Sequence, residues 1–206
     1  MKKLIRIAAA PMSLDILLRG QLQFLNNYYE VVGVASPDKE LHQKISDREG
    51  IRMVEIEIER KISLLKDLKS LIRLYILFRR EKPHIVHSLT PKAGLLSMTA
   101  AWGARVPLRI HTFTGLIFPW KKGIMGWLLK TMDKLTCTAA TTVIPEGEGG
   151  RKDLVNNNIT KKLSPVLANG NINGIDLDYF KPVCRNKKDT ITRFIFVGRI
   201  VHDKGI

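Results

Sequence analysis

The sequence has few cysteines and lacks any long apolar run, and both absences narrow the class of protein. Only Cys137 and Cys184 occur, far apart in the chain, so neither a disulfide framework nor a cysteine zinc site is indicated. No stretch approaches the roughly 20 apolar residues that span a bilayer. The N-terminal apolar run ends at Pro11 after about seven residues, which is short for a signal-peptide core and favours a first strand. We therefore expect a protein of the reducing cytoplasm.

Two common phosphate-binding fingerprints are also missing. The turn after the first apolar run reads Ala10-Pro11-Met12-Ser13, without the G-x-G-x-x-G pattern of dinucleotide-binding folds, and no Walker-type loop occurs. These absences remove the two commonest assignments for a basic α/β protein. No residue spacing indicates a metal site either, so we expect neither a cofactor nor a metal.

Acidic residues are scarce in the middle third of the chain. The formal net charge is +15, and residues 61–135 hold 14 basic but only 3 acidic side chains. This asymmetry predicts an anionic partner, which could be a lipid headgroup, a nucleic acid or a phosphorylated substrate. A nucleic acid is disfavoured because the sequence has no basic stripe interleaved with stacking aromatic residues and no known binding motif.

What the sequence does contain is a regular alternation of short apolar runs with longer segments of helical spacing. Six runs have the composition of strands, at residues 3–10, 30–36, 51–58, 84–89, 106–113 and 140–145. The alternation predicts an α/β fold with a Rossmann-like parallel sheet and helices on both faces. Ligands of such sheets bind beyond the carboxyl ends of the strands, so we expect functional residues in the loops that follow these runs.

Two segments have the pattern of helices that contact a membrane surface. On a helix over residues 64–80, basic residues form one side and a broad apolar face forms another. That apolar face comprises Leu64, Leu65, Leu68, Leu71, Ile72, Tyr75 and Ile76. Further along, Trp120, Lys121, Lys122, Trp127 and Lys130 combine tryptophans and lysines as interfacial segments do. The alternative for the first segment is a helix whose apolar face packs on the core.

Five segments, taken in order, resemble bacterial glycosyltransferases of family 4. They are LLRGQLQFLNNYYEVVGVAS (17–36), KDLKSLIRLYILFRREKPHIVHSLTPKAGLLSMTAA (66–101), VPLRIHTFTGL (106–116), NGNINGIDLDYFKP (169–182) and FVGRIVHDKG (196–205). The resemblance implies the two-domain GT-B architecture. Residues 1–184 would form the N-terminal Rossmann-like acceptor-binding domain and residues 185–190 a linker. Residues 191–206, in which 194–197 have the composition of a buried strand, would be the truncated start of the nucleotide-sugar-binding domain.

The implied activity is transfer of a sugar, with retention of its anomeric configuration, from a nucleoside-diphosphate sugar to a lipid-linked acceptor. The resemblance points to capsule, O-antigen or exopolysaccharide synthesis at the inner face of the cell membrane, with no metal. It assigns the donor diphosphate to Gly198, Arg199 and Lys204, whose cations would stabilise the leaving group. Thr114 occupies the catalytic position before Gly115 where many relatives have a histidine. A chain without the donor-domain glutamates of the family is expected to be inactive.

The predicted acceptor site comprises Ser13, His87, Thr90, Lys92 and Gly115. Residue 91 is a proline, which suits the first turn of a helix, so Thr90 is placed to cap that helix. The free amides of the first turn would favour an anionic group, and Lys92 would add a mobile cation. The alternative is a well-capped helix with a solvated lysine.

Other functions fit parts of the pattern. A non-catalytic sugar-nucleotide-binding module would explain the fold together with the missing glutamates. A sugar-nucleotide epimerase of GT-B-like fold is the enzymatic alternative. His111 is interpreted as a structural residue of its strand and not as a substitute for the missing histidine.

Overall fold

The structure is a computed structural model that describes residues 1–59, 62–181, 194–198 and 200, without the side chain of Trp120. The chain divides into two compact units, Met1–Gly174 and Ile175–Ile206. Arg199, Lys204 and the predicted linker at 185–190 lie outside the described residues. The predicted boundary at residue 184 does so as well, and it stays a prediction.

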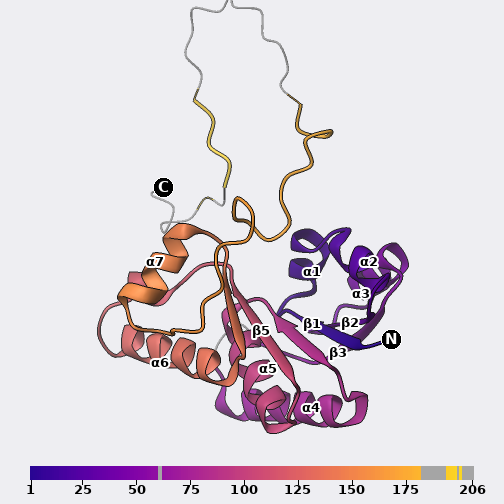
Figure 1. The fold of residues 1–206 in the computed structure, drawn as a ribbon, viewed down its shortest axis with the longest axis horizontal. Helices are drawn as coiled ribbons and strands as arrows, with labels where there is room; N and C mark the ends of the chain where they lie inside the picture. The colour runs from indigo at the N-terminus through magenta and orange to yellow at the C-terminus, as the bar shows by residue number, and fades with distance from the viewer. Residues whose placement is uncertain (60–61, 182–193, 199, 201–206) are drawn as a thin grey trace, which may run out of the picture. The chain divides into compact units, whose positions relative to one another are not determined.

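The first unit is built on a parallel sheet of six strands (Figure 1). The strands are β1 (Lys3–Ile7), β2 (Glu30–Ala35), β3 (Arg52–Glu55), β4 (Ile85–Ser88), β5 (Leu108–Phe113) and β6 (Thr142–Pro145). Their order is β3-β2-β1-β4-β5-β6, and every neighbouring pair is parallel. Each of the six predicted runs contains one of these strands, so the predicted fold class is confirmed.

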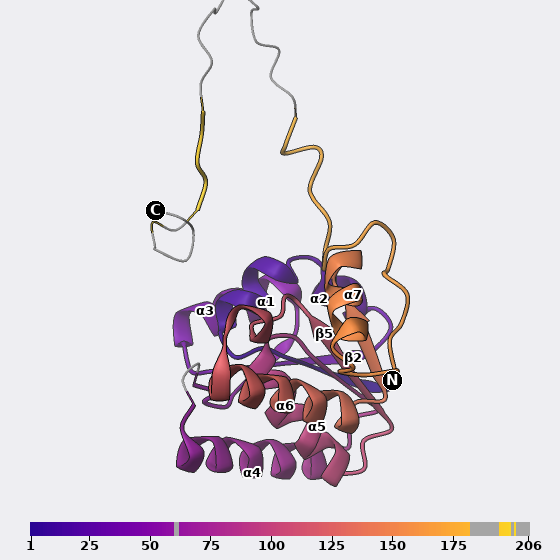
Figure 2. The same cartoon turned by 90° about the vertical axis from the view of Figure 1, so that its left-hand side faces the viewer.

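Helices cover both faces of this sheet (Figures 1 and 2). One face carries α1 (Pro11–Leu17), α2 (Gln21–Asn26) and α3 (Lys39–Glu49), and the other carries α4 (Leu64–Glu81), α5 (Pro91–Gly103) and α6 (Gly123–Ala139). The short helix η1 (Phe118–Trp120) precedes α6, and α7 (Glu148–Asn156) follows β6. Strands β1, β2 and β4 are rich in apolar residues because side chains on both of their faces are buried under helices, whereas the edge strand β3 has no buried residue.

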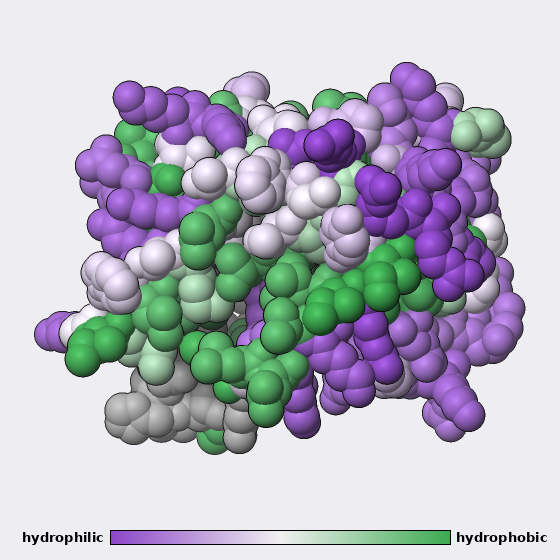
Figure 3. Space-filling model, turned by 90° about the horizontal axis from the view of Figure 1, so that it is seen from below, coloured by the Kyte–Doolittle hydropathy of each residue, from purple (hydrophilic) through white to green (hydrophobic). Residues whose placement is uncertain are grey.

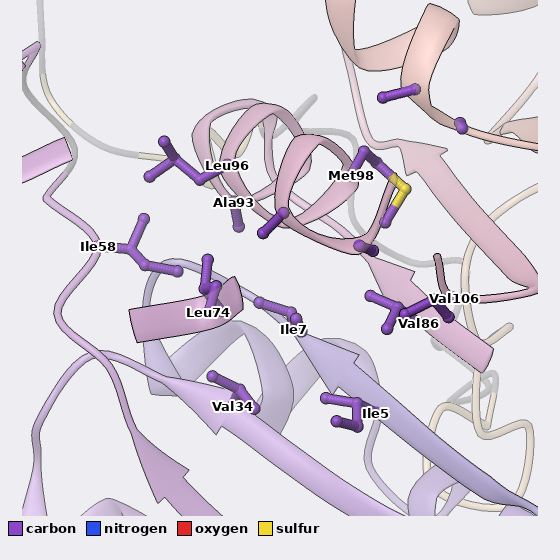
Figure 4. Packing of buried hydrophobic residues seen from close by; sticks show 14 of the residues in the cluster. Ile5, Ile7, Val34, Ile58, Leu74, Val86, Ala93, Leu96, Met98 and Val106 are labelled. Carbon is purple, nitrogen blue, oxygen red and sulfur yellow. The ribbon is translucent and has the colours of Figure 1, made fainter. Parts of the chain in front are cut away.

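Alternation along β1 distributes its side chains between two hydrophobic clusters. Ile5 and Ile7 face the cluster under α4, α5 and α6, whereas Leu4 faces the cluster under α1, α2 and α3. Figure 4 shows the first cluster, which contains Ile5 and Ile7 of β1, Leu74 of α4 and Met98 of α5. Each such buried aliphatic side chain contributes about 1.5–3 kcal/mol, so this two-layer packing fixes the strands that carry the site.

Helix α4 confirms the helix expected over residues 64–80, but its most deeply buried residues are not those of the predicted apolar face. Its core-facing residues are Ser70, Leu74 and Phe78, which lie four residues apart on one stripe. The predicted apolar face lies beside this stripe, and Leu64 and Leu65 are 82% and 85% exposed. The helix therefore packs on the core with its basic side exposed, as the alternative predicted, but of the predicted apolar face only Leu71 packs against the core and the other six residues are exposed.

The buried strand expected at residues 194–197 is also wrong for the described structure. These four residues have irregular backbone, and Phe194 is 95% exposed. A parallel strand forms only beside a hydrogen-bonding neighbour and under covering helices. The described part of the second unit, 175–181, 194–198 and 200, contains no strand that could serve as that neighbour.

Candidate functional site

The strand order creates a topological switch point between β1 and β4. The helix that follows β1 packs on one face of the sheet, and α5, which follows β4, packs on the other. A crevice therefore opens beyond the carboxyl ends of these two neighbouring strands, which is where open α/β sheets bind their ligands.

A cavity of about 100 Å³ lies at this switch point. Its polar lining consists of Arg6, Gln21, His87, Thr112, Glu146 and Asn171. Its apolar lining consists of Ile144, Pro145, Leu167 and Ile172. The polar residues come from β1, α2, β4, β5 and two loops that are far apart in the sequence, so the fold itself assembles the site.

Larger hollows exist, but their position disfavours them as the principal site. Two of about 370 and 500 Å³ lie beside the outer strand β3, and one of about 330 Å³ lies at the amino edge of the sheet, near the starts of β4 and β5. Only the smaller cavity lies at the carboxyl edge among these four, and the geometry of parallel sheets directs ligands there.

Arg6 is the buried cation of the site. It is 3% exposed and shares the register of His87 on the neighbouring strand. Its Nη2 donates to Gln21 Oε1 at 3.0 Å and its Nη1 donates to His87 Nδ1, whereas its Nε has no hydrogen-bond partner. Burial lowers the pKa of Arg6 to about 9, so the guanidinium remains protonated at neutral pH.

His87 is held as a neutral imidazole with one defined tautomer. Arginine only donates hydrogen bonds, so His87 Nδ1 accepts from Arg6, and the ring hydrogen lies on Nε2. That Nε2 donates to Thr112 Oγ1 at 2.8 Å. Burial, followed by the charge of Arg6, holds the pKa of His87 well below its usual range. His87 therefore positions its neighbours and does not exchange a proton near neutral pH.

The segment after residue 166 closes the cavity from the side of α2. Gln21 Nε2 donates to the carbonyl oxygen of Ile172 at 3.1 Å, and Asn173 Nδ2 donates to the carbonyl oxygen of Arg19 at 2.8 Å. The Asn171 amide donates to the carbonyl oxygen of Glu146 at 2.8 Å. The N-G-N-I-N-G stretch thus connects Arg6, through Gln21, to the loop that covers the site.

Thr90 does not cap α5 as the sequence predicted. It precedes the helix, which begins at Pro91, but its side chain makes no capping hydrogen bond. Its Oγ1 instead accepts from the Ala9 amide at 3.1 Å, so Thr90 joins the end of β4 to the end of β1. The cap prediction failed because the hydroxyl meets a backbone donor from a neighbouring strand, which sequence spacing does not reveal.

Lys92 is not the mobile cation that the sequence predicted. Its side chain is buried and its Nζ lies 2.6 Å from Asp67 Oδ1 at the start of α4. Position 92 projects from the side of α5 that packs on α4, and this ion pair joins the two helices. The pairing leaves Lys92 as a structural residue on the opposite side of the sheet from Arg6.

The remaining predicted residues of this region lie outside the cavity lining. Ser13 is half-buried on α1, and Thr114 is half-buried after β5. Gly115 is exposed with φ +136°, a conformation that favours glycine. His87 is thus the one member of the predicted acceptor set that lines the cavity. His111 is buried in β5 with its Nδ1 2.8 Å from Ser88 Oγ, which agrees with a structural role.

The predicted membrane-surface residues lie around the start of α6. Lys121, Lys122 and Trp127 are exposed, and Lys130 is half-buried. Within the described residues, no helix is long and apolar enough to cross a membrane, and no cluster of three or more His, Cys, Asp or Glu could hold a metal ion. Of the predicted donor residues, Gly198 is described and exposed, whereas Arg199 and Lys204 lie outside the described residues.

Sequence reasoning missed Arg6 and Gln21. It did not single out Thr112 or Glu146, although both lie in loops where functional residues were expected, 112–116 and 145–148. One signal was present, because Arg6 interrupts the apolar run of residues 4–10 in a strand of a sheet expected to be buried on both faces. A charged residue in such a strand is seldom fully buried unless it has a partner or a function. The partners themselves depend on strand order and register, which a single sequence does not provide.

Comparison with known proteins identifies similar chains. Residues 25–170 match the glycosyl transferase 4-like domain. The capsular polysaccharide biosynthesis glycosyltransferase CapM of Staphylococcus aureus is 36% identical over 199 residues, 92% of this chain and 51% of that protein. The UDP-Gal:alpha-D-GlcNAc-diphosphoundecaprenol alpha-1,3-galactosyltransferase of Escherichia coli is 35% identical over 145 residues, 68% of this chain and 35% of that protein.

A solved structure agrees with the fold. Anabaena HepE in complex with UDP and glucose superimposes with a TM-score of 0.64 at 12% identity, over 89% of this chain and 47% of that chain. This likeness supports the Rossmann-like architecture of the first unit. The chain spans about half of CapM and HepE, and a smaller share of the galactosyltransferase.

Proposed function

This chain belongs to the glycosyl transferase 4-like family, and from that premise we propose that it supplies the acceptor-binding half of a retaining GT-B glycosyltransferase. The acceptor would be a lipid-linked saccharide, and the pathway would build a capsule or related surface polysaccharide. The donor would be a nucleoside-diphosphate sugar held by a second domain. No cofactor or catalytic metal is part of this proposal.

The observation that carries the proposal is the polar cavity at the switch point of the sheet. Arg6, His87 and Thr112 form a connected hydrogen-bonded row across β1, β4 and β5, and the loop from Leu167 to Ile172 covers it. Such a row can hold saccharide hydroxyls in a fixed orientation, because its own side chains are already immobilised. The name of the Escherichia coli relative specifies a diphosphoundecaprenol-linked acceptor, which supports the acceptor class proposed here.

Isothermal titration tests whether this chain binds the acceptor and not the nucleotide-sugar donor. A short-chain polyprenyl-diphosphate N-acetylhexosamine should bind this chain, whereas UDP-sugars and GDP-sugars should show no tight binding. Thr112→Val removes the hydroxyl at the end of the row and should weaken acceptor binding about tenfold, the scale of one lost hydrogen bond. Thr138→Val, at an exposed position of α6, is the matched control. Micromolar affinity for a nucleotide-sugar, or no binding of the acceptor, would contradict the proposal.

We also propose that the acceptor is reached at an anionic membrane surface. Exposed apolar residues gather on α4 and on the first turns of α6, among them Leu65, Leu68 and Trp127. Figure 3 shows a band of hydrophobic surface bordered by hydrophilic side chains, viewed from the side of the molecule where α4 and α6 lie. Lys121 and Lys122 are exposed at the start of α6, so this surface combines apolar area with positive charge, as interfacial segments do.

The alternatives are separable by their chemistry. An epimerase acts on the nucleotide-sugar itself, so it would bind UDP-sugars and need no lipid-linked acceptor. A non-catalytic module would bind a nucleotide-sugar without transferring the sugar. The relatives at 35–36% identity are both named glycosyltransferases, which favours the transferase.

A further inference from the structure

Arg6 forms no ion pair in the part of the chain that the structure describes. Its hydrogen-bond partners, Gln21 and His87, are both neutral, and none of the ion pairs among the described residues includes it. Burying a cation without a counter-charge is costly, and natural proteins seldom do so unless a ligand completes the site. The unpaired charge lies in the wall of the cavity.

Two hydrogen-bond donors of residues that line this cavity have no acceptor among the described residues. Arg6 Nε is buried and has no partner. Thr112 Oγ1 accepts from His87 Nε2, and its own hydroxyl hydrogen has no acceptor among the described residues. Because His87 is neutral and both of its ring nitrogens are engaged, Arg6 is the one positively charged side chain among the described residues that line the cavity.

Among the described residues, Glu146 is the one carboxylate that lines the cavity. Its side chain is half-buried and takes part in no hydrogen bond or ion pair among the described residues. It is therefore near enough to repel an anion in the cavity, but it does not neutralise Arg6. Replacing Glu146 with a neutral residue should therefore strengthen the binding of an anionic ligand, which makes this substitution a test of the site.

We propose that this cavity binds a single oxyanion of the acceptor, a carboxylate or a phosphoryl group, against Arg6. The inference rests on the proposed function, because it names the chemical group of the acceptor that the site recognises. A volume of about 100 Å³ is smaller than the roughly 150 Å³ of a cavity that accommodates benzene, so this cavity suits one small group of a larger ligand. Guanidinium groups bind both kinds of oxyanion through paired donors.

The test measures the rise in melting temperature of the 206-residue chain with three probes at equal ionic strength: inorganic phosphate, glucuronate and the neutral methyl glucoside. Phosphate or glucuronate should stabilise the chain, and methyl glucoside should not. Stabilisation by glucuronate alone identifies an acidic sugar as the source, and stabilisation by phosphate alone identifies a phosphoryl group.

Variants attribute the effect to the cavity. Arg6→Gln should weaken oxyanion binding by about 10- to 100-fold, the scale of a charge-assisted hydrogen bond, and Arg6→Lys should weaken it less. Glu146→Gln, which changes a half-buried side chain without a partner, should fold normally and strengthen binding. Lys134→Gln, at an exposed position of α6, controls for loss of one positive charge.

Each outcome decides the inference. Equal stabilisation of Arg6→Gln and the wild type, an equal loss of stabilisation in Arg6→Gln and Lys134→Gln, no stabilisation by either oxyanion, or weaker binding by Glu146→Gln would overturn it. If Arg6→Gln does not fold, the Glu146→Gln result still discriminates. Binding of the lipid-linked acceptor without any oxyanion effect would reject this inference alone, whereas oxyanion binding without acceptor binding would reject the proposed function and leave the oxyanion site.

Discussion

Gly94 and His111 show how single residues set the distance between α5 and the sheet. A Cβ atom at Gly94 would lie 2.3 Å from Cε1 and 2.7 Å from Nδ1 of His111. The imidazole is 1% exposed, is hydrogen-bonded to Ser88 and meets the ring of Phe113 edge-on at 4.5 Å. Burial lowers the pKa of His111 to about 3, so the ring is neutral. Its burial, its hydrogen bond and its contact with Phe113 leave the ring no room to move away from a Cβ atom at position 94.

We therefore expect Gly94→Ala to destabilise the first unit by about 1–3 kcal/mol, the usual effect of overpacking a rigid core. The matched control is Gly103→Ala at the last residue of the same helix. A Cβ there would lie 3.7 Å from the Tyr75 ring, an ordinary contact, and alanine should leave stability unchanged or raise it slightly. Urea unfolding followed by circular dichroism measures both, and equal stability of the two variants would contradict the argument.

At the scale of residues, the sequence predicted the positions of residues at strand and helix ends better than it predicted their contacts. His87 lines the cavity, as its position at the end of a predicted strand suggested. Thr90 and Lys92 were placed correctly at the start of a helix, but their partners, Ala9 and Asp67, come from distant segments. Contacts of this kind follow from strand order and helix packing, so residue spacing alone could not predict them.

At the scale of elements, an ionic cluster joins α1, α2 and α3, and α2 carries Gln21. The side chain of Glu49, at the end of α3, accepts from the Gly20 and Gln23 amides at 3.0 Å each, so it caps α2 from another helix. Arg48 pairs with both Glu49 and Asp15 of α1. Burial alone would raise the pKa of Glu49, but the two amides and Arg48 outweigh it and hold the pKa below its usual range.

Replacing Glu49 with alanine should destabilise the first unit by about 1–2 kcal/mol at neutral pH, the scale of a lost helix cap. Because the folded pKa is lowered, this stabilisation is present above the unfolded pKa and is lost as the pH falls through the folded value. The difference between variant and wild type should therefore shrink below about pH 4. Asp47→Ala, exposed on the same helix, is the control and should change stability by less than about 0.5 kcal/mol.

Helix α4 illustrates what periodicity determines for an element. Its apolar spacing predicted a helix over residues 64–80, and the structure places one at Leu64–Glu81. Periodicity could not show which of its apolar stripes meets the sheet, because α4 has two. The stripe of Leu74 and Phe78 is buried, and the stripe of Leu65 and Leu68 is exposed.

At the scale of the whole first unit, the alternation of strands and helices was enough to predict a parallel sheet with two covered faces. The position of the switch point was not predicted, because it depends on the order β3-β2-β1-β4-β5-β6. That order places Arg6 beside His87 although they are 81 residues apart. The exposed stripe of α4 and the exposed start of α6 belong to the same face, which gives the first unit one surface that is both apolar and basic.

This surface should bind anionic bilayers. Each basic residue near a negatively charged membrane contributes about 1 kcal/mol, so changing Lys121, Lys122 and Lys130 to Glu should weaken binding at least about tenfold. The attraction should fall with added salt, because charges are screened over about 8 Å at physiological ionic strength. Trp127, which is 67% exposed, should keep part of the binding at high salt by inserting into the interface, and Trp127→Ser should remove that part.

Co-sedimentation with vesicles of graded anionic lipid content measures these effects. The control reverses three exposed lysines elsewhere, Lys2, Lys39 and Lys152, which changes the net charge equally but leaves the α4 and α6 surface intact. Binding that rises with anionic lipid and is lost only in the first triple variant supports docking through this surface. Equal recovery with neutral and anionic vesicles, or equal loss in both triple variants, would mean that overall charge and not this surface governs the interaction. The positive charge of residues 61–135 would then serve a soluble anionic partner.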